Sequence, residues 1–575
     1  MAKVQQQDMA QLHQQVLAGE RDAPSRFSSE GRAYAKWRKQ EKRSAREVEK
    51  RQQMLGGITP VRGELTRTSA KGRGVRGKYG GYAASVSSPQ EWQTTTNLGC
   101  GFNLNVVGAP APMIGTPLGR HAVTGAEIGC DPMSWFKEGI IANPSQMVFS
   151  LPGLGKSTLV RKQLMGGVAA GRTAIIAGDI KAEYVGFAEQ VGGQVITVGH
   201  GKGQINPLDI GALGRVIPRI ERAVEEADTP ERKAELETLQ LGAAEQVLNR
   251  QRSMVTMLVG LSRGERIKDY EAMIVSIGLR HLAAERRSTD APPLLSDLVK
   301  LLEHGTPELR DAARARTDEQ WAQRIDALML SLNSLLDGPT GRIFSGQTTT
   351  PINVDAPAVC IDVSQIDSAD EHLKAAVMMS CWHSAFGAIE AAHILADSGL
   401  GPQRYFDLVL DELWQVLAAA PGMVDEVDKL SRLNRSWAVS LSLISHTFKD
   451  LKALPTEEDR QTAMGFVERA GMVISGGLPA SELDILEGRL IFSPAEEQMI
   501  TSWSRGVPPK RSRSVAGRSV PPGRGRMMIK PSKDGSAGIP VQVLLTPFES
   551  EHDLHDTNKR FSSYFAEATV DGVGL

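Results

Sequence analysis

The chain has 575 residues, of which 41% are hydrophobic and 23% are charged, a composition ordinary for a soluble globular protein. This length exceeds what one compact core needs, so we expect two or three units. The four cysteines show no CxxC or Cys/His spacing, which argues against a disulfide framework or a zinc site. No stretch of about 18 apolar residues occurs and no secretory signal opens the sequence, so we expect a cytoplasmic protein without a membrane span.

The N-terminal segment 1–95 is strongly basic. It carries 18 Lys and Arg against 9 Asp and Glu, although the whole chain has a net charge of -1. Two interpretations stay open. The segment is either a flexible, solvated arm or an arm that contacts nucleic acid, anionic lipid or a protein partner.

The segment 96–212 is predicted to hold an N-terminal β region and the first part of an α/β core. Short apolar runs alternate with Gly and Pro as far as Met147, which indicates strands and turns. Buried strands are then expected at 147–149, 173–177 and 194–198. Apolar strands separated by helical patterns are typical of a parallel sheet that is covered on both faces.

The segment 213–345 has a different composition, rich in Leu, Ala, Glu and Arg, and predicts an all-helical insertion. The second part of the core is expected over 346–562, followed by a tail at 563–575. Four strands are predicted in this part, at 358–363, 406–410, 439–444 and 471–475. A basic loop is predicted at 503–530. At its end, a closing hairpin is expected from the strands 526–530 and 541–546.

A phosphate-binding loop is predicted directly after the first buried strand. The segment reads Ser150-Leu151-Pro152-Gly153-Leu154-Gly155-Lys156-Ser157-Thr158. It matches the pattern GxxxxGK[ST] except at Ser150, where glycine is usual. Gly153 and Gly155 still allow the backbone N–H groups to surround phosphate oxygens. Lys156 is expected to reach the β and γ phosphates of ATP, and the Ser157 hydroxyl to bind Mg²⁺.

Two acids follow the predicted strand 406–410. A phosphate loop needs a carboxylate at the end of a neighbouring strand, and Asp411 and Glu412 stand at such an end. Asp411 is expected to orient the magnesium-bound water, and Glu412 to activate the attacking water as a general base. The alternative is an exposed strand end with two solvated acids.

Two further polar segments follow buried strands, where loops line the ligand crevice of a parallel sheet. One reads Asp179-Ile180-Lys181-Ala182-Glu183-Tyr184 and the other reads Ile205-Asn206-Pro207-Leu208-Asp209. Asp179 is expected to shape the nucleotide site or, equally well, to cap a helix.

Three residues near the strand 439–444 are candidates for sensing or completing the site. Arg432 and Arg435 precede the strand, and either could reach a neighbouring subunit's nucleotide as an arginine finger. The alternative is a surface arginine. His446 follows the strand at the position of a γ-phosphate sensor, although a structural histidine is an equal alternative.

The order of these motifs resembles that of the conjugative type IV secretion ATPases, relatives of the FtsK and HerA DNA pumps. The resemblance also uses Leu545-Thr546-Pro547-Phe548-Glu549 and Asp556-Thr557-Asn558, and covers roughly residues 100–562. It implies an α/β fold: a RecA-like P-loop core with a mainly parallel sheet, interrupted by an all-α insertion domain. It further implies ATP and Mg²⁺ as ligands and a homo-oligomer, either a hexamer or a dimer.

The resemblance also implies a place at the inner face of the cell membrane, with the membrane components of a secretion or conjugation channel as partners. Two features depart from the family. Glutamine is usual at the sensor position, where Ser445 and His446 stand here, and the short basic arm replaces a longer N-terminal region.

Three functions are therefore weighed. The first is an ATPase that energises conjugation or secretion. The second is a DNA-translocating motor, with DNA threading past a basic loop at Arg511, Arg513 and Arg518. The third is a scaffold that binds ATP without hydrolysing it.

Overall fold

A computed structural model describes most of the chain from residue 112 to residue 555. The described ranges are 112–199, 201–285, 291–366, 370–418, 437–454, 456–486, 489–505, 521–531 and 536–552, with isolated residues and runs of up to four residues elsewhere. The chain divides into two compact units. One comprises Met1–Trp92, Lys510–Val520 and Leu544–Leu575, and the other comprises Gln93–Pro509 and Pro521–Val543. In the first unit, β1 (Val75–Arg76) pairs with β2 (Tyr82–Ala83), and α20 spans Pro547–Glu551.

The second unit is built on a mixed sheet that has 11 strands within the described ranges. From edge to edge, the strands are β4 (Glu127–Gly129), β3 (Pro117–His121), β13 (Ile539–Val543), β12 (Arg526–Lys530), β11 (Met472–Ser475), β5 (Ser145–Phe149), β10 (Val439–Ser445), β9 (Phe406–Leu410), β6 (Thr173–Asp179), β8 (Ala358–Asp362) and β7 (Gln194–Thr197). The strands from β11 to β7 run parallel, and the remaining four pair antiparallel.

Helices cover both faces of the parallel part, and its strands β11, β5, β10, β9, β6 and β8 are buried along their whole length. Along β5, Met147 and Phe149 pack into one core, and Val148 packs into the other. The second core contains α4 (Lys156–Ala169), α5 (Val185–Gln190) and α3 (Pro132–Lys137). The first contains α13 (Glu371–Asp397), α14 (Leu413–Leu417), α16 (Lys449–Lys452), α17 (Glu457–Arg469), α18 (Ala480–Leu483) and α19 (Pro494–Trp503).

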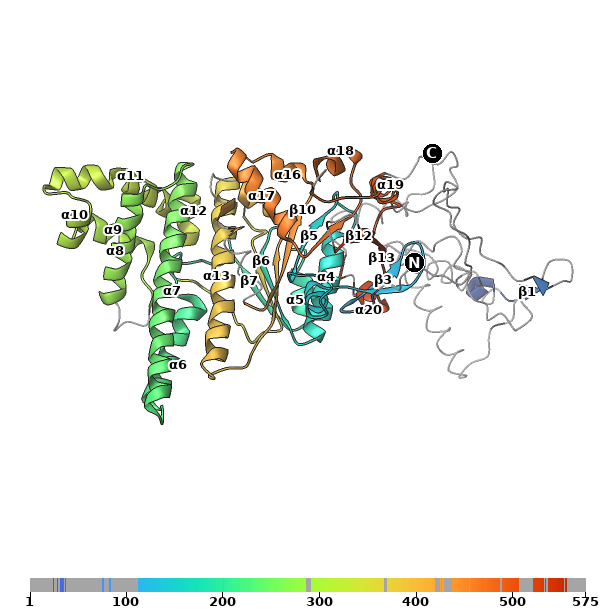
Figure 1. The fold of residues 1–575 in the computed structure, drawn as a ribbon, viewed down its shortest axis with the longest axis horizontal. Helices are drawn as coiled ribbons and strands as arrows, with labels where there is room; N and C mark the ends of the chain where they lie inside the picture. Colours follow the sequence, from blue (N-terminus) through green and yellow to red (C-terminus); the bar gives the residue numbers. More distant parts are fainter. Residues whose placement is uncertain are drawn as a thin grey trace. The chain divides into compact units, whose positions relative to one another are not determined.

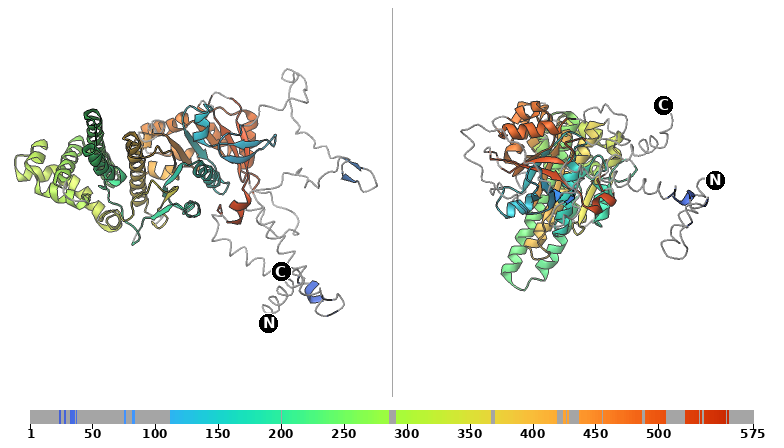
Figure 2. Two further views of the ribbon diagram at one scale, coloured as in Figure 1. Left: turned by 90° about the horizontal axis from the view of Figure 1, so that it is seen from below. Right: turned by 90° about the vertical axis from the view of Figure 1, so that its right-hand side faces the viewer.

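Helices alone make up the described part of the segment between β7 and β8. They are α6 (Gly211–Glu225), α7 (Pro230–Arg263), α8 (Asp269–Glu285), α9 (Leu295–His304), α10 (Pro307–Ala312), α11 (Asp318–Leu336) and α12 (Gly338–Phe344). Figures 1 and 2 show α13 between the sheet and the pair α6 and α7, and α13 contacts both of these helices and β6. The predicted helical interruption of an α/β core is therefore confirmed.

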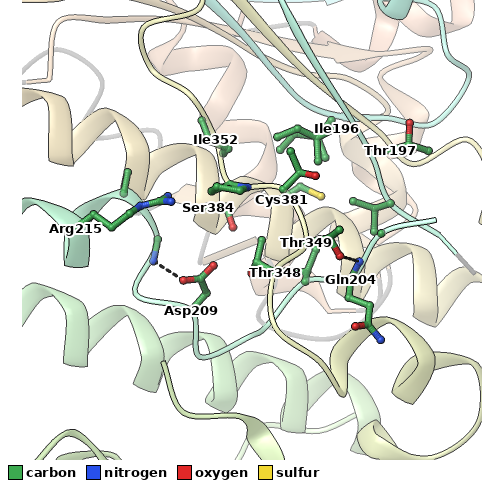
Figure 3. A pocket seen from close by; sticks show the side chains of 18 residues that line it. Ile196, Thr197, Gln204, Asp209, Arg215, Thr348, Thr349, Ile352, Cys381 and Ser384 are labelled. Atoms are coloured by element: carbon green, nitrogen blue, oxygen red, sulfur yellow. Dashed lines mark hydrogen bonds between the residues drawn. The ribbon is translucent and has the colours of Figure 1, made fainter. Parts of the chain in front are cut away.

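The two connections between this helical segment and the sheet run side by side. The backbone N–H of Gln204 donates to Thr349 Oγ1 at 2.9 Å, and Asp209 Oδ1 accepts from Gly211 N. All four residues line a pocket, which is shown in Figure 3. The buried Asn206 joins the two connections, since its Nδ2 donates to Gln347 Oε1 at 3.0 Å and to Pro293 O at 2.9 Å. Asn206 of the Ile-Asn-Pro segment thus holds together the two connections at the base of the helical segment, which we call its root.

Most predicted strands agree with the observed bounds to within two residues. The last strand ends earlier than expected, at Val543, because Thr546 caps α20 through Glu549 N and is no longer extended. The region before Met147 also contains α3, which the sequence prediction of strands and turns missed. Asp131 caps this helix and Pro132 occupies its first position, which is a recognisable helix start.

Candidate active site

The phosphate loop lies between β5 and α4, as the sequence predicts. Gly153 and Gly155 both adopt left-handed backbone angles, with φ of 78° and 105°. Residues with side chains adopt these angles only with strain, so the two glycines allow the tight curl of the chain. Gly155 precedes Lys156 as the N-cap of α4, and no side chain caps this helix start. The N–H groups and the dipole of such a helix start attract anions such as phosphate, which is the role predicted for this loop.

Ser150 fits at the start of the loop because the facing residue lacks a side chain. The serine is fully buried, and a Cβ placed on Gly476, just after β11, would lie only 2.4 Å from Ser150 Oγ. The loop is held on two sides: Leu151 N donates to Gly477 O at 3.2 Å, and Gly525 N donates to Leu154 O at 2.8 Å.

The two acids follow β9, but this strand is not the immediate neighbour of β5. Strand β10 lies between them, so the expectation that the acids stand on a neighbouring strand was wrong. The groups nevertheless converge, because β10 supplies the link. His446, one residue after β10, contacts Lys156 with Nδ1 and Glu412 with Nε2, the latter at 3.2 Å from Oε1.

This arrangement fixes the hydrogen positions on His446. A lysine ammonium can only donate, so Nδ1 of His446 accepts from Lys156. The ring hydrogen then lies on Nε2 and is donated to Glu412. His446 thereby connects the phosphate loop to the acid pair.

Glu412 is buried and held by several donors. Lys181 and His446 contact Oε1, and Trp414 Nε1 donates to Oε2 at 2.8 Å. Burial alone would raise the pKa of Glu412, but the hydrogen bond from His446 and the charge of Lys181 hold that pKa well below its ordinary value. Glu412 itself has φ of 50°, so strained backbone aims its side chain at these partners.

Asp411 is in a different electrostatic state from Glu412. Burial, with the negative charges of Glu412 and Glu183, raises the pKa of Asp411 to about 6 although Lys156 opposes the shift. Burial also lowers the pKa of Lys156, against the opposing charges of Asp411 and Glu412.

A magnesium ion is implied by this class of site, and the residues present fit it. Ser157 follows Lys156 in the first turn of α4 and is partly buried, as is Thr158. A serine hydroxyl and the Asp411 carboxylate are hard oxygen donors of the kind that Mg²⁺ prefers.

Asp179 lies at the end of β6 and organises the loop that follows. Its carboxylate accepts from the backbone N–H groups of Lys181, Glu183 and Tyr184, at 3.3, 3.0 and 2.7 Å. Burial raises the pKa of Asp179, although these bonds from the backbone oppose the shift. The carboxylate of Asp179 therefore stabilises the conformation of this loop through its three backbone hydrogen bonds.

The loop brings two further residues to the acid pair. Both belong to the motif at 179–184, but the sequence alone predicts no role for either of them. Lys181 contacts Glu412, and the Tyr184 hydroxyl donates to Asp411 Oδ2 at 3.1 Å. Their position after a parallel strand was the available signal. Which acid each would meet depends on the strand order.

Two other predicted features lie outside the described residues. Arg432 and Arg435 belong to the stretch 429–436, and Arg511, Arg513 and Arg518 belong to 506–520. The roles given to these arginines stay predictions.

Comparison with known proteins supports the fold. No family model and no curated protein matches the chain. The chain is similar in structure to VirB4 of Thermoanaerobacter pseudethanolicus, with a TM-score of 0.54 and 17% identity over 77% of this chain and 99% of that chain. It is also similar to the plasmid coupling protein TrwB in complex with ADP and Mg²⁺, with a TM-score of 0.41 and 12% identity over 76% of this chain and 97% of that chain.

The likeness to VirB4 shows a shared fold, and the expected α/β core with a mainly parallel sheet is confirmed. It also agrees with the family resemblance of the sequence motifs. Within the described ranges, no helix combines the length and the apolar character that crossing a membrane requires.

Proposed function

We propose that the chain is an ATP-hydrolysing motor that energises conjugative DNA transfer or type IV protein secretion. The observation that carries this proposal is the chain of contacts from Lys156 through His446 to Glu412. It joins a phosphate loop to a buried carboxylate across an intervening strand. The fold shared with VirB4 supports the same assignment.

In this proposal, ATP binds with its phosphates against the N–H groups of the loop 150–158 and the start of α4. Lys156 leaves His446 Nδ1 and turns to the β and γ phosphates. Ser157 and Asp411 would hold a Mg²⁺ ion, which would supply positive charge to the phosphate oxygens when bound.

Glu412 is the general base. It accepts a proton from a water molecule whose oxygen attacks the γ phosphorus, the bond to the β-phosphate oxygen breaks, and ADP and phosphate are released. Its low pKa keeps it ionised at neutral pH. When Lys156 moves to the phosphates, His446 loses its contact with Lys156. Because the same imidazole also contacts Glu412, nucleotide binding is thereby coupled to the general base.

The wider setting follows from the family resemblance. We place the chain at the cytoplasmic face of the membrane, as a hexamer or a dimer whose partners are the membrane components of a secretion or conjugation channel. Arg435 or Arg432 would complete a neighbouring subunit's site. DNA is a further partner if the chain translocates it directly.

The test compares the wild type with Glu412→Gln, using Glu497→Gln on an exposed position of α19 as the control. Glu412→Gln should lower the ATPase rate by about 10² to 10⁴ and leave binding of a non-hydrolysable ATP analogue intact. Equal turnover in the two variants would contradict the assigned base. A wild type that binds the analogue but never hydrolyses ATP would support a scaffold instead.

DNA and membrane components can be separated as partners by what stimulates hydrolysis. Stimulation by DNA that falls steeply with salt supports a DNA-translocating motor. Stimulation that needs only membrane components of the channel supports the secretion ATPase.

A further inference from the structure

The loop 179–184 is a rigid support next to the acid pair. Three backbone N–H groups bind the Asp179 carboxylate, and Ala182 holds a left-handed φ of 51°. Arg161 of α4 ties the same loop to the helix that carries the phosphate loop, by donating to Glu183 O and to Ser157 O. Side chains on this loop are therefore fixed relative to Lys156.

Each acid receives one side chain from this loop. Lys181 reaches Glu412 Oε1, and the buried Tyr184 donates to Asp411 Oδ2 at 3.1 Å. A phenol keeps its hydrogen at neutral pH, so Tyr184 is the donor in this bond. Lys181 thus bonds to Glu412, and Tyr184 bonds to Asp411.

The contacts leave little freedom to Glu412. A carboxylate offers about four acceptor sites, and Lys181, His446 and Trp414 occupy three of them. One acceptor site remains to orient an attacking water. Without Lys181, Oε1 keeps only the bond from His446, which itself depends on Lys156.

Asp411 is oriented by two donors. Tyr184 holds Oδ2, and the backbone N–H of Glu412 holds Oδ1 at 2.8 Å. Outer partners of this kind set the direction in which a metal-binding carboxylate points, and their loss typically weakens metal binding by about 10- to 100-fold.

We infer that Lys181 and Tyr184 are positioning residues with separate tasks: Lys181 orients Glu412 for catalysis, and Tyr184 orients Asp411 for Mg²⁺. This inference rests on the proposed ATPase function. The Lys181 side chain is 48% exposed, so a purely structural role predicts almost no effect when it is replaced.

The variants are Lys181→Met, Lys181→Arg and Tyr184→Phe, with Lys202→Met as a control at another exposed loop lysine after a parallel strand. Lys181→Met should lower kcat by about tenfold or more, because a misplaced base is costly even when the substrate binds normally. Affinity for a non-hydrolysable ATP analogue should stay within about threefold of the wild type, and Lys181→Arg should regain part of the lost kcat.

Tyr184→Phe should give the opposite pattern. The Mg²⁺ concentration for half-maximal binding of the ATP analogue should rise by about tenfold, and kcat should recover at saturating Mg²⁺. The binding measurement is independent of turnover. It therefore still tests Tyr184 if the wild type proves to be a non-hydrolysing scaffold.

Three results would overturn the inference. They are a kcat for Lys181→Met equal to that of Lys202→Met, no gain from Lys181→Arg over Lys181→Met, and an unchanged Mg²⁺ requirement in Tyr184→Phe. A loss of analogue binding in Lys156→Ala with wild-type behaviour in all three variants would keep the nucleotide site and reject the positioning roles.

Discussion

Ser150 and Gly476 share one small space at the base of the phosphate loop. The serine side chain occupies the room that a Cβ on residue 476 would need, with a separation of 2.4 Å. The departure of Ser150 from the usual glycine is thus matched by a glycine directly after the adjacent strand β11.

This pairing predicts the outcome of a double mutant. Gly476→Ala alone should destabilise the protein by about 1–3 kcal/mol, because a side chain is forced into a filled core. Adding Ser150→Gly should recover most of that loss. Urea denaturation measures both effects, and a double mutant as unstable as Gly476→Ala would contradict the pairing.

A second prediction concerns His446. In the nucleotide-free protein, Lys156 must leave His446 before it can bind phosphate. His446→Ala should therefore tighten binding of a non-hydrolysable ATP analogue by at least about threefold, since a charged hydrogen bond no longer competes. The same variant should lower kcat, because Glu412 loses a donor. Weaker analogue binding in a correctly folded variant would argue against this competition.

A third prediction concerns the root of the helical segment. Asn206→Ala removes donors to Pro293 O and Gln347 Oε1 and the acceptor of Leu208 N. Because these buried groups then lack hydrogen-bond partners, the free energy of unfolding measured in urea should fall by about 1–3 kcal/mol. The exposed Asn353→Ala should stay within about 0.5 kcal/mol of the wild type. Equal stability of the two variants would count against Asn206 as the joint between the connections.

A fourth prediction uses the buried pair Arg263 and Glu271 in the helical segment. The two bonds between their side chains measure 2.7 and 2.8 Å, and Glu271 is fully buried. Burial would raise the pKa of Glu271, but the bonds from Arg263 and the Lys268 N–H outweigh it and lower that pKa. A lowered folded-state pKa adds stability above the unfolded value of about 4.3, and this is lost as pH falls through the folded pKa.

Glu271→Gln should accordingly destabilise the protein by about 3 kcal/mol at pH 7, where Arg263 keeps a buried charge without its partner. The difference from the wild type should shrink as the pH falls below about 4.3. Denaturation at pH 7 and at about pH 3 measures it, with the exposed Glu237→Gln as the control. A pH-independent difference would show that the charge of Glu271 is not what stabilises the pair.

Much of the fold was predictable because apolar strands and amphipathic helices have distinct periods. The ends of β9 and β12 were predicted to the residue. Sheet order was not predictable, since nothing in the local sequence says that Val439–Ser445 inserts between β5 and β9. For that reason the sequence predicts Asp411 and Glu412 on a strand next to β5, whereas β10 lies between β5 and β9.

The site was predictable at its two motifs and less so between them. Lys156 and Glu412 follow from short patterns with a known chemistry. The contacts of Lys181 and Tyr184 depend on β6 lying beside β9, and the fit of Ser150 depends on β11 lying beside β5. Such relationships connect residues far apart in the sequence and appear only once the strands are in register.

The central claim is that Lys156 and the acids at 411 and 412 meet on one magnesium–triphosphate. A structure of the chain with Mg²⁺ and a non-hydrolysable ATP analogue tests it most directly. We expect Lys156 Nζ to leave His446 and to contact the β and γ phosphates, with Ser157 and Asp411 on the metal side. A triphosphate bound elsewhere, or Lys156 still paired with His446 beside a bound analogue, would contradict it.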